Sequence, residues 1–376
     1  MKKDAKILIT VFSLLLIIPL ALTIFFIVRE PDKSFSEWEN RELAKFPPIT
    51  AKAVFSGEWG QDFESFLTDR FCFRDGFTKL KRALDSALLI KENGGVYITE
   101  SSLFDIPDTP SAEYIENNIS AINAFCKNNE LDATLILVPS KASLYEENLP
   151  PLAPKTEEKE LISKIYEQVE IDSVDMYEVF SGRDMSDVFY DTDHHWTSFG
   201  AELAYRAWQK SNTDYERVVV SESFLGTLTS RSQDASVSPD VMEKATAGEV
   251  FECEIFNGRE NIKYPSMYFD EYLSKKDKYS YFLGTNQPLV TLTSKEATSK
   301  KTLLIFKDSF AHSFVQYATD FETVILVDMR YATPALLSRL AEIAPDEVLF
   351  LQSFETFSTQ NNLILLNNLK LFGTFS

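Results

Sequence analysis

The chain has 376 residues, of which 57 are acidic and 37 are basic, so its formal net charge is −20. This charge disfavours nucleic-acid binding, because a protein that binds phosphates needs a basic face. The length allows one large domain or two ordinary ones, and 30 Phe, 15 Tyr and 4 Trp supply enough apolar volume for a sizeable core. The three cysteines, Cys72, Cys126 and Cys253, are far apart and match no metal-ligand spacing.

The first predicted element is an uncharged, largely apolar run over residues 7–28. It is long enough to cross the roughly 30 Å hydrocarbon core of a bilayer as a helix. Lys2, Lys3 and Lys6 precede it, which predicts a cytoplasmic N-terminus and an extracytoplasmic body. A cleaved signal peptide is the alternative, but its apolar region is usually shorter and ends in a small-x-small site. We therefore expect a single-pass cell-membrane anchor within residues 1–30.

Residues 31–110 are expected to form a linker and a helical stalk. Pro31, Pro47 and Pro48 punctuate the segment that leaves the membrane. From Trp59 to Leu89, apolar residues recur at helical spacing, which predicts two helices.

Residues 111–376 alternate between helical patterns and short apolar runs, which is typical of a three-layer α/β fold on a parallel sheet. The expected helices cover 112–128, 157–169, a segment that begins at 197 or 198, and 334–343. The expected strands cover 133–138, 171–179, 302–306, 323–327 and 347–351. Between them, 213–300 holds short stretches of Val, Phe, Tyr and Thr separated by turn residues, so we expect an inserted β-rich region. Active sites of such sheets lie at the carboxyl ends of the strands.

The three histidines lie in two short segments, one with Asp193, His194 and His195, the other with Ser309 and His312. Histidine is the side chain that most readily exchanges a proton near neutral pH. Ser309 follows the expected strand 302–306, so its hydroxyl would be exposed there and its own N–H could stabilise an oxyanion. A serine nucleophile needs a base and a group that orients this base. Asp193, two residues before His195, is placed for that role.

These residues also have structural interpretations. Asp308 or Ser309 can simply cap a helix, and the paired histidines can form a cap network under Trp196. His312 is a second possible base, but a nucleophile and a base on one helix face leave little room for substrate. A metal site is a further interpretation, with four polar residues of one segment as ligands: Asp191, Asp193, His194 and His195.

The segments Asp193-His194-His195-Trp196 and Lys307-Asp308-Ser309-Phe310 resemble the signature of the DHHW family. Further matches are Pro-Ser-Lys at 139–141, Asp-Met-Arg-Tyr at 328–331, and Phe-Ser-Glu with Glu-Asn-Arg at 35–41. The family is similar to the alginate O-acetyltransferases of the J and X type. The resemblance therefore implies an SGNH-hydrolase-like fold.

The resemblance also implies a catalytic triad. In it, Ser309 is the nucleophile, His195 the general base and Asp193 the orienting acid. Three neighbours are expected to support the triad: His194, Trp196 and Asp308. The related enzymes have glycine where this chain has Lys307, which places a cation beside the nucleophile.

SGNH enzymes further use a Gly-x-Asn element whose asparagine helps to hold the oxyanion. Gly284 and Asn286 are the best candidates for it, and an ordinary Gly/Asn turn is the alternative. Arg330 and Lys141 are candidates for binding substrate oxygens or ordering the site. A structural or solvent-facing ion pair is the alternative for each.

The implied function is an extracytoplasmic, serine-dependent O-acetyltransferase that modifies an envelope or secreted polysaccharide through an acyl-serine intermediate, without a metal or a cofactor. The implied partners are the polysaccharide acceptor and a membrane-bound O-acyltransferase that brings acetyl across the membrane. A carbohydrate esterase (deacetylase) with the same triad is one alternative, because the sequence does not decide whether a sugar hydroxyl or water attacks the acyl-enzyme. A non-catalytic polysaccharide-binding or scaffold subunit is another, because fold does not fix function.

Overall fold

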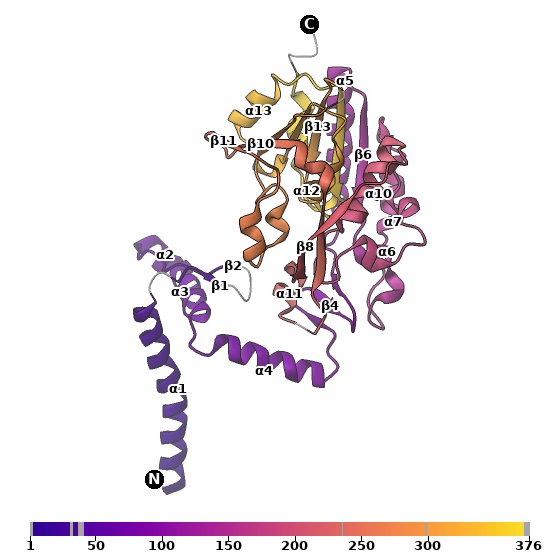
Figure 1. Ribbon diagram of the computed structural model, residues 1–376. Coiled ribbons are helices and arrows are strands. Elements are labelled where there is room, and N and C mark those ends of the chain that lie inside the picture. The colour runs from indigo at the N-terminus through magenta and orange to yellow at the C-terminus, as the bar shows by residue number, and fades with distance from the viewer. Residues whose placement is uncertain (1–2, 31–32, 37–40, 235, 298, 372–376) are drawn as a thin grey trace. The chain divides into compact units, whose positions relative to one another are not determined.

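The computed structural model describes residues 3–30, 33–36, 41–234, 236–297 and 299–371 (Figure 1). Its contacts divide the chain into two compact units, Met1–Gly94 and Gly95–Ser376. The second unit begins before the strands β4 (Val96–Ile98) and β5 (Leu103–Asp105), which share a small apolar cluster with Leu228. The boundaries expected at 30 and 110 stay predictions.

The first unit is mainly helical. Its elements are α1 (Lys3–Arg29), β1 (Phe35–Ser36), β2 (Arg41–Glu42), α2 (Ala51–Ser56), α3 (Glu58–Asp69), α4 (Arg74–Ala87) and β3 (Glu92–Asn93). Helix α1 matches the expected apolar helix and is long and apolar enough to cross a membrane. Helices α3 and α4 match the two expected between 59 and 89. Lys2 and the motif residues 37–40 lie outside the described residues.

The second unit is built on an eight-stranded sheet with the order β11-β10-β12-β14-β13-β15-β6-β7. The parallel strands are β14 (Thr323–Val327), β13 (Thr302–Lys307), β15 (Glu347–Ser353), β6 (Ala133–Val138) and β7 (Asp172–Ser173). The antiparallel strands are β12 (Leu289–Ser294), β10 (Phe251–Phe256) and β11 (Asn261–Tyr264). The sheet is therefore mixed. Three strands of the expected insertion extend it, a pairing that the sequence did not predict.

The sheet is covered on both faces, which gives the expected three layers. Along β13, Leu303 and Ile305 belong to one apolar cluster, and Leu304 and Phe306 to another. This alternation follows from the two-residue period of a strand. Helices α10 (Ser198–Gln209) and α12 (Ala311–Phe314) contribute to the first cluster, and α5 (Ala112–Asn129) and α13 (Pro334–Leu340) to the second.

Most expected helices form. The remaining helices are α6 (Lys141–Leu144), α7 (Glu158–Tyr166), α8 (Met176–Val179), α9 (Met185–Val188), α11 (Thr227–Ser232) and α14 (Phe354–Thr359). Short 3₁₀ helices include η4 (Tyr279–Tyr281), η5 (Val315–Tyr317) and η6 (Met329–Tyr331), and β8 (Arg217–Phe224) pairs with β9 (Asp240–Ala245). The strand expected over 171–179 is wrong beyond Ser173. The Asp175 side chain accepts the N–H of Tyr177 at 2.9 Å and caps α8 instead.

Candidate active site

Ser309 lies in the turn that joins the carboxyl end of β13 to α12, as the sequence predicts (Figure 1). Asp308 fixes this turn, because its Oδ1 accepts the N–H of Phe310 at 3.0 Å. Its Oδ2 accepts the N–H and hydroxyl of Ser353 at 2.7 and 2.8 Å, which ties the turn to β15. Within the described residues the N–H of Ser309 donates to no acceptor. It is therefore free to bind an oxyanion.

The structure brings Ser309, His195 and Asp193 together. Nε2 of His195 lies 2.7 Å from Oγ of Ser309, across 114 residues of sequence. Nδ1 of the same ring lies 2.6 Å from Oδ1 of Asp193. Each contact has hydrogen-bond length, so the ring links the hydroxyl to the carboxylate. This is the order of contacts that activates a serine.

Asp193 is buried and accepts hydrogen bonds on both oxygens. Oδ1 accepts the N–H of His195 at 3.0 Å, and Oδ2 accepts the N–H and hydroxyl of Thr227 at 2.7 and 2.9 Å. Burial alone would raise the pKa of Asp193, but the two adjacent histidine rings and these hydrogen bonds hold the pKa well below its usual value. The carboxylate therefore stays ionised. Gly226 makes this approach possible, because a Cβ there would collide with the Asp193 side chain.

Lys141 orders the segment that carries Asp193. Its buried ammonium donates to the carbonyls of Tyr190 at 2.7 Å and of Asp191 and Asp193 at 3.3 Å each, and to Oγ of Ser102 at 3.2 Å. Burial lowers the pKa of Lys141 to about 8. Because these acceptors surround the ammonium, the contacts favour the ordering role over the binding of substrate oxygens.

Asp240 completes the support of this segment from β9. Its carboxylate accepts the N–H groups of Asp191 and Thr192 at 2.7 and 2.9 Å. Neither Asp240 nor Thr227 was singled out from the sequence. Both lie within 213–300, far along the chain from the histidines, and no local motif marks them.

The Tyr279 ring packs against one face of the His195 ring. The two rings are stacked, with centroids 3.8 Å apart and planes at 9°. The Tyr279 hydroxyl lies 3.0 Å from Oγ of Ser313 and 3.3 Å from the carbonyl of Ser309. It therefore ties the His195 ring to the turn that carries Ser309. Sequence reasoning missed this residue, since an aromatic in a β-rich segment is an ordinary core residue.

Trp196 and His194, expected as supporting residues, lie against the same site. Nε1 of Trp196 donates to the carbonyl of Phe310 at 3.0 Å and to Oγ of Ser313 at 2.9 Å. Nδ1 of His194 lies 2.9 Å from the hydroxyl of Thr227. Burial and the neighbouring histidine lower the pKa of His194 to about 4. His194 thus contacts the same Thr227 hydroxyl that donates to the Asp193 carboxylate.

Lys307 and His312 belong to a second buried network. Nζ of Lys307 lies 2.8 Å from Nε2 of His312, and 3.5 Å from both Oδ2 of Asp328 and Oδ1 of Asn286. Arg330 donates twice to the Asp328 carboxylate, at 2.8 and 2.6 Å. Burial, and then the Lys307 charge, lower the pKa of His312 well below its usual value. His312 is therefore a neutral acceptor for Lys307 and not the base of Ser309.

The expected oxyanion element lies in the loop between η4 and β12. Gly284 has a φ of +72°, a left-handed conformation that suits glycine. Oδ1 of Asn286 faces Lys307, and its amide nitrogen has no partner among the described residues. Asn286 therefore has a free donor, while its part in oxyanion binding stays a prediction.

The metal interpretation finds partial geometric support. The ligand atoms of Asp193, His194 and His195 lie within 4.8 Å of one another, and Asp191 is not part of this group among the described residues. However, both Asp193 oxygens and both His195 nitrogens already have hydrogen-bond partners. This pairing favours proton transfer over metal coordination.

Comparisons with known sequences agree with the motifs. Residues 97–214 match the family model of the SGNH hydrolase-like domain of acetyltransferase AlgX. The probable alginate O-acetylase AlgJ of Pseudomonas syringae pv. tomato is 24% identical over 179 residues, which is 44% of this chain and 46% of that protein. AlgJ of Pseudomonas aeruginosa is 25% identical over 176 residues, 44% of this chain and 45% of that protein. The chain thus matches less than half the length of these relatives.

Solved structures extend the similarity over about three quarters of the chain. A DHHW family protein from Eubacterium siraeum has a TM-score of 0.59 at 19% identity, over 74% of this chain and 97% of that protein. PatB1 of Bacillus cereus also has a TM-score of 0.59, at 20% identity, over 73% of this chain and 99% of that protein. The predicted resemblance is confirmed. The chain has the SGNH-hydrolase-like fold and is similar to a DHHW family protein and to alginate O-acetylases.

Proposed function

We propose that this chain is a serine-dependent O-acetyltransferase that acts on an envelope or secreted polysaccharide. The observation that carries the proposal is the chain of contacts from Ser309 through His195 to Asp193, at 2.7 and 2.6 Å. The similarity to acetyltransferase AlgX and to the probable alginate O-acetylases supports acetyl transfer to a sugar hydroxyl.

The reaction runs in two halves. In the first, Nε2 of His195 takes the hydroxyl proton as Oγ of Ser309 attacks the acetyl carbonyl of the donor. The ionised Asp193 stabilises the imidazolium, and the N–H of Ser309 donates to the oxyanion. Collapse expels the donor's leaving group, which takes the proton from His195. In the second half, a sugar hydroxyl gives its proton to His195 and attacks the acetyl carbonyl of the acetyl-serine. Collapse expels Oγ of Ser309, which takes the proton from His195, so both the serine and the base are regenerated.

Lys307 adds charge to this site. Two cations, Lys307 and Arg330, share the single carboxylate of Asp328, and His312 is neutral. The buried Asp308 carboxylate also attracts both cations, so Lys307 is a buried cation within a mixed-charge network two residues before Ser309. Because charges act strongly in a low-dielectric interior, the Lys307 cation favours the negative charge of the tetrahedral intermediate. The lysine that replaces the usual glycine thus has an electrostatic role.

The apolar helix α1 supports a membrane-anchored enzyme with an extracytoplasmic catalytic unit. The acetyl group would then come from a membrane-bound O-acyltransferase partner, since an acyl donor made in the cytoplasm must reach the other side. The acceptor would be a polysaccharide of the envelope or one that is secreted. The relatives are named for the acetylation of alginate, a polysaccharide of this kind.

The test uses the full chain in lipid nanodiscs with p-nitrophenyl acetate as the donor. We expect a burst of nitrophenolate and one acetyl group on Ser309 by mass spectrometry, followed by transfer to an added oligosaccharide. Ser309→Ala should abolish the burst. Ser338→Ala, which removes an exposed hydroxyl that donates to the carbonyl of Pro334, is the matched control. Equal bursts from wild type and Ser309→Ala would refute the mechanism, and acetate release without sugar transfer would assign an esterase.

A further inference from the structure

Helix α4 exposes an apolar face. Phe77, Leu80, Leu84 and Leu88 are 56%, 55%, 56% and 72% exposed, and their spacing of three and four residues places them on one side of the helix. A helix of a water-soluble domain usually packs such a stripe against a core. This stripe therefore points to an apolar surrounding that the described residues of its own unit do not supply.

The turn that precedes α4 contacts the candidate membrane helix. The N–H of Cys72 donates to Oγ1 of Thr23 at 3.2 Å, and its thiol lies 3.5 Å from the carbonyl of Pro19. At 1.5 Å per residue, Thr23 is about 8 Å and Pro19 about 14 Å below the end of the apolar run at Val28. The turn is thus at a depth that a bilayer around α1 would occupy.

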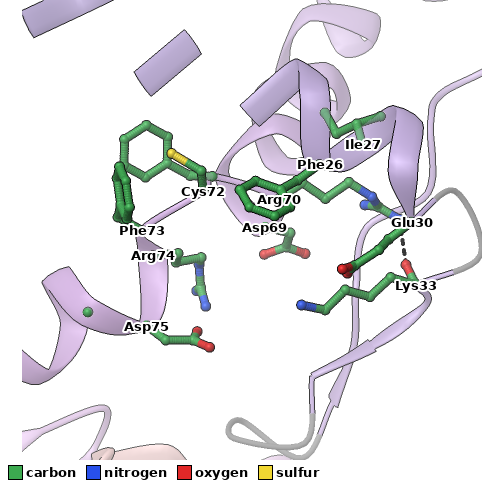
Figure 2. A pocket seen from close by; sticks show the side chains of 12 residues that line it. Phe26, Ile27, Glu30, Lys33, Asp69, Arg70, Cys72, Phe73, Arg74 and Asp75 are labelled. Atoms are coloured by element: carbon green, nitrogen blue, oxygen red, sulfur yellow. Dashed lines mark hydrogen bonds between the residues drawn. The ribbon is translucent and has the colours of Figure 1, made fainter. Parts of the chain in front are cut away.

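Exposed aromatic and charged side chains gather around this turn. Phe71 and Phe73, on either side of Cys72, are 36% and 50% exposed. Glu30 and Lys33, just beyond α1, line one pocket together with four charged residues at the turn (Figure 2), namely Asp69, Arg70, Arg74 and Asp75. Exposed aromatic rings beside a helix end rich in charge are what the boundary between acyl chains and head groups accommodates.

The charge of this segment is opposite to that of the chain. Residues 70–91 hold six basic and two acidic side chains, a surplus of four positive charges, whereas the whole chain has a net charge of −20. Amphipathic helices that lie on anionic bilayers combine an exposed apolar face with basic residues. Basic side chains near the surface of an anionic leaflet are attracted to it.

We propose that residues 70–91, the α3–α4 turn with the apolar face of α4, form a second membrane contact that inserts into the leaflet beside α1. This inference rests on the membrane anchoring of α1 in the proposed function. Its occupant is phospholipid, and the contact would hold the chain against the bilayer at two points. Contact with another protein at this face is the alternative outcome of the test.

The test places a nitroxide spin label on either side of α4 in the full chain. The background is Cys72→Ala, Cys126→Ala and Cys253→Ala, and the labelled positions are Leu84→Cys and the control Ser86→Cys. Both residues are exposed. Because they are two residues apart in the helix, their side chains point in directions about 200° apart around its axis. The protein is placed, one copy per disc, in nanodiscs of phosphatidylcholine and phosphatidylglycerol. Collisions with oxygen, which concentrates in lipid, and with a nickel chelate, which stays in water, are then measured.

We expect the ratio of oxygen to nickel collisions to be several-fold higher at Leu84 than at Ser86. Equal ratios at both positions overturn the inference, and so does a Leu84 label shielded from both reagents, which would mean that protein covers this face. Flotation of the unlabelled background with vesicles tests the anchor, and its failure overturns both the anchor and the second contact. Acetylation of Ser309 in the same samples tests the chemistry independently. A failure confined to the label comparison therefore refutes the second contact alone.

Discussion

Asp193→Asn is the substitution that separates a catalytic carboxylate from a structural one. Both carboxylate oxygens of Asp193 face a fixed backbone donor, the N–H of His195 at 3.0 Å and the N–H of Thr227 at 2.7 Å. An asparagine can present its carbonyl oxygen to only one of them. The N–H of Thr227 lies closer, so it would repel an amide NH₂ more strongly than the N–H of His195 would. We therefore expect the asparagine carbonyl to face Thr227 and its NH₂ to face His195.

This orientation changes the tautomer of the His195 imidazole. An NH₂ at the position of Oδ1 donates to Nδ1 of His195, which then carries its proton on Nε2, the nitrogen that faces Ser309. The base is lost, and so is the negative charge that stabilises the imidazolium. In serine enzymes the equivalent change lowers the rate about 10⁴-fold. The N–H left without an acceptor should cost about 1–3 kcal/mol of unfolding free energy.

The assay measures the rate of Ser309 acetylation by p-nitrophenyl acetate, with circular dichroism and urea unfolding to verify the fold. Asp191→Asn is the matched control, because it neutralises a carboxylate of the same segment that contacts neither His195 nor Ser309. We expect Asp193→Asn to lose at least three orders of magnitude, as the triad template implies, and Asp191→Asn to keep most of the activity. A folded Asp193→Asn protein whose rate stays within a few-fold of the wild-type rate would refute the catalytic role of the Asp193 carboxylate.

Three further outcomes follow from buried groups around the site. Lys307→Met keeps the volume but removes the buried cation, so acetylation should slow about 10–100-fold, a barrier increase of about 1.4–2.7 kcal/mol. Its urea midpoint should fall, because buried Asp328 loses one of its two cations and His312 loses its donor, and a normal rate would contradict the electrostatic role. Tyr279→Leu should lower the rate up to about tenfold through loss of the stacked ring, whereas Tyr279→Phe keeps the ring and should lose less. An equal loss in both would assign the effect to the hydroxyl. Burial raises the pKa of Glu158 to about 7, despite hydrogen bonds from Ser140. The folded state therefore holds this proton more tightly, so wild-type stability should fall as pH rises from about 4.5 to 7. Relative to Glu158→Gln, wild type should lose about 2–3 kcal/mol between pH 5 and 8 in urea unfolding, and parallel curves would disprove the shift.

The sequence predicted the elements whose formation depends on residues close together in the chain. The apolar runs at 133–138, 302–306 and 323–327 form the buried parallel strands, because a strand covered on both faces must be apolar throughout. Motif residues also gave the pairing of His195 with Ser309, since a catalytic serine requires a base and the chain has few histidines. Short polar segments were less certain, and the side chain of Asp175 turned part of an expected strand into a helix.

Only the tertiary structure decided which distant groups complete the site. Thr227 contacts Asp193 and Tyr279 stacks on His195, both from a region that the sequence marked only as β-rich. Lys141 proved to donate hydrogen bonds to backbone carbonyls. His312, equivalent to the other histidines by composition, is a neutral partner of Lys307. The physical reason is the range of the interactions. Periodicity and capping depend on neighbours within a few residues, whereas the burial and hydrogen bonds that set a side chain's charge come from segments brought together by the fold.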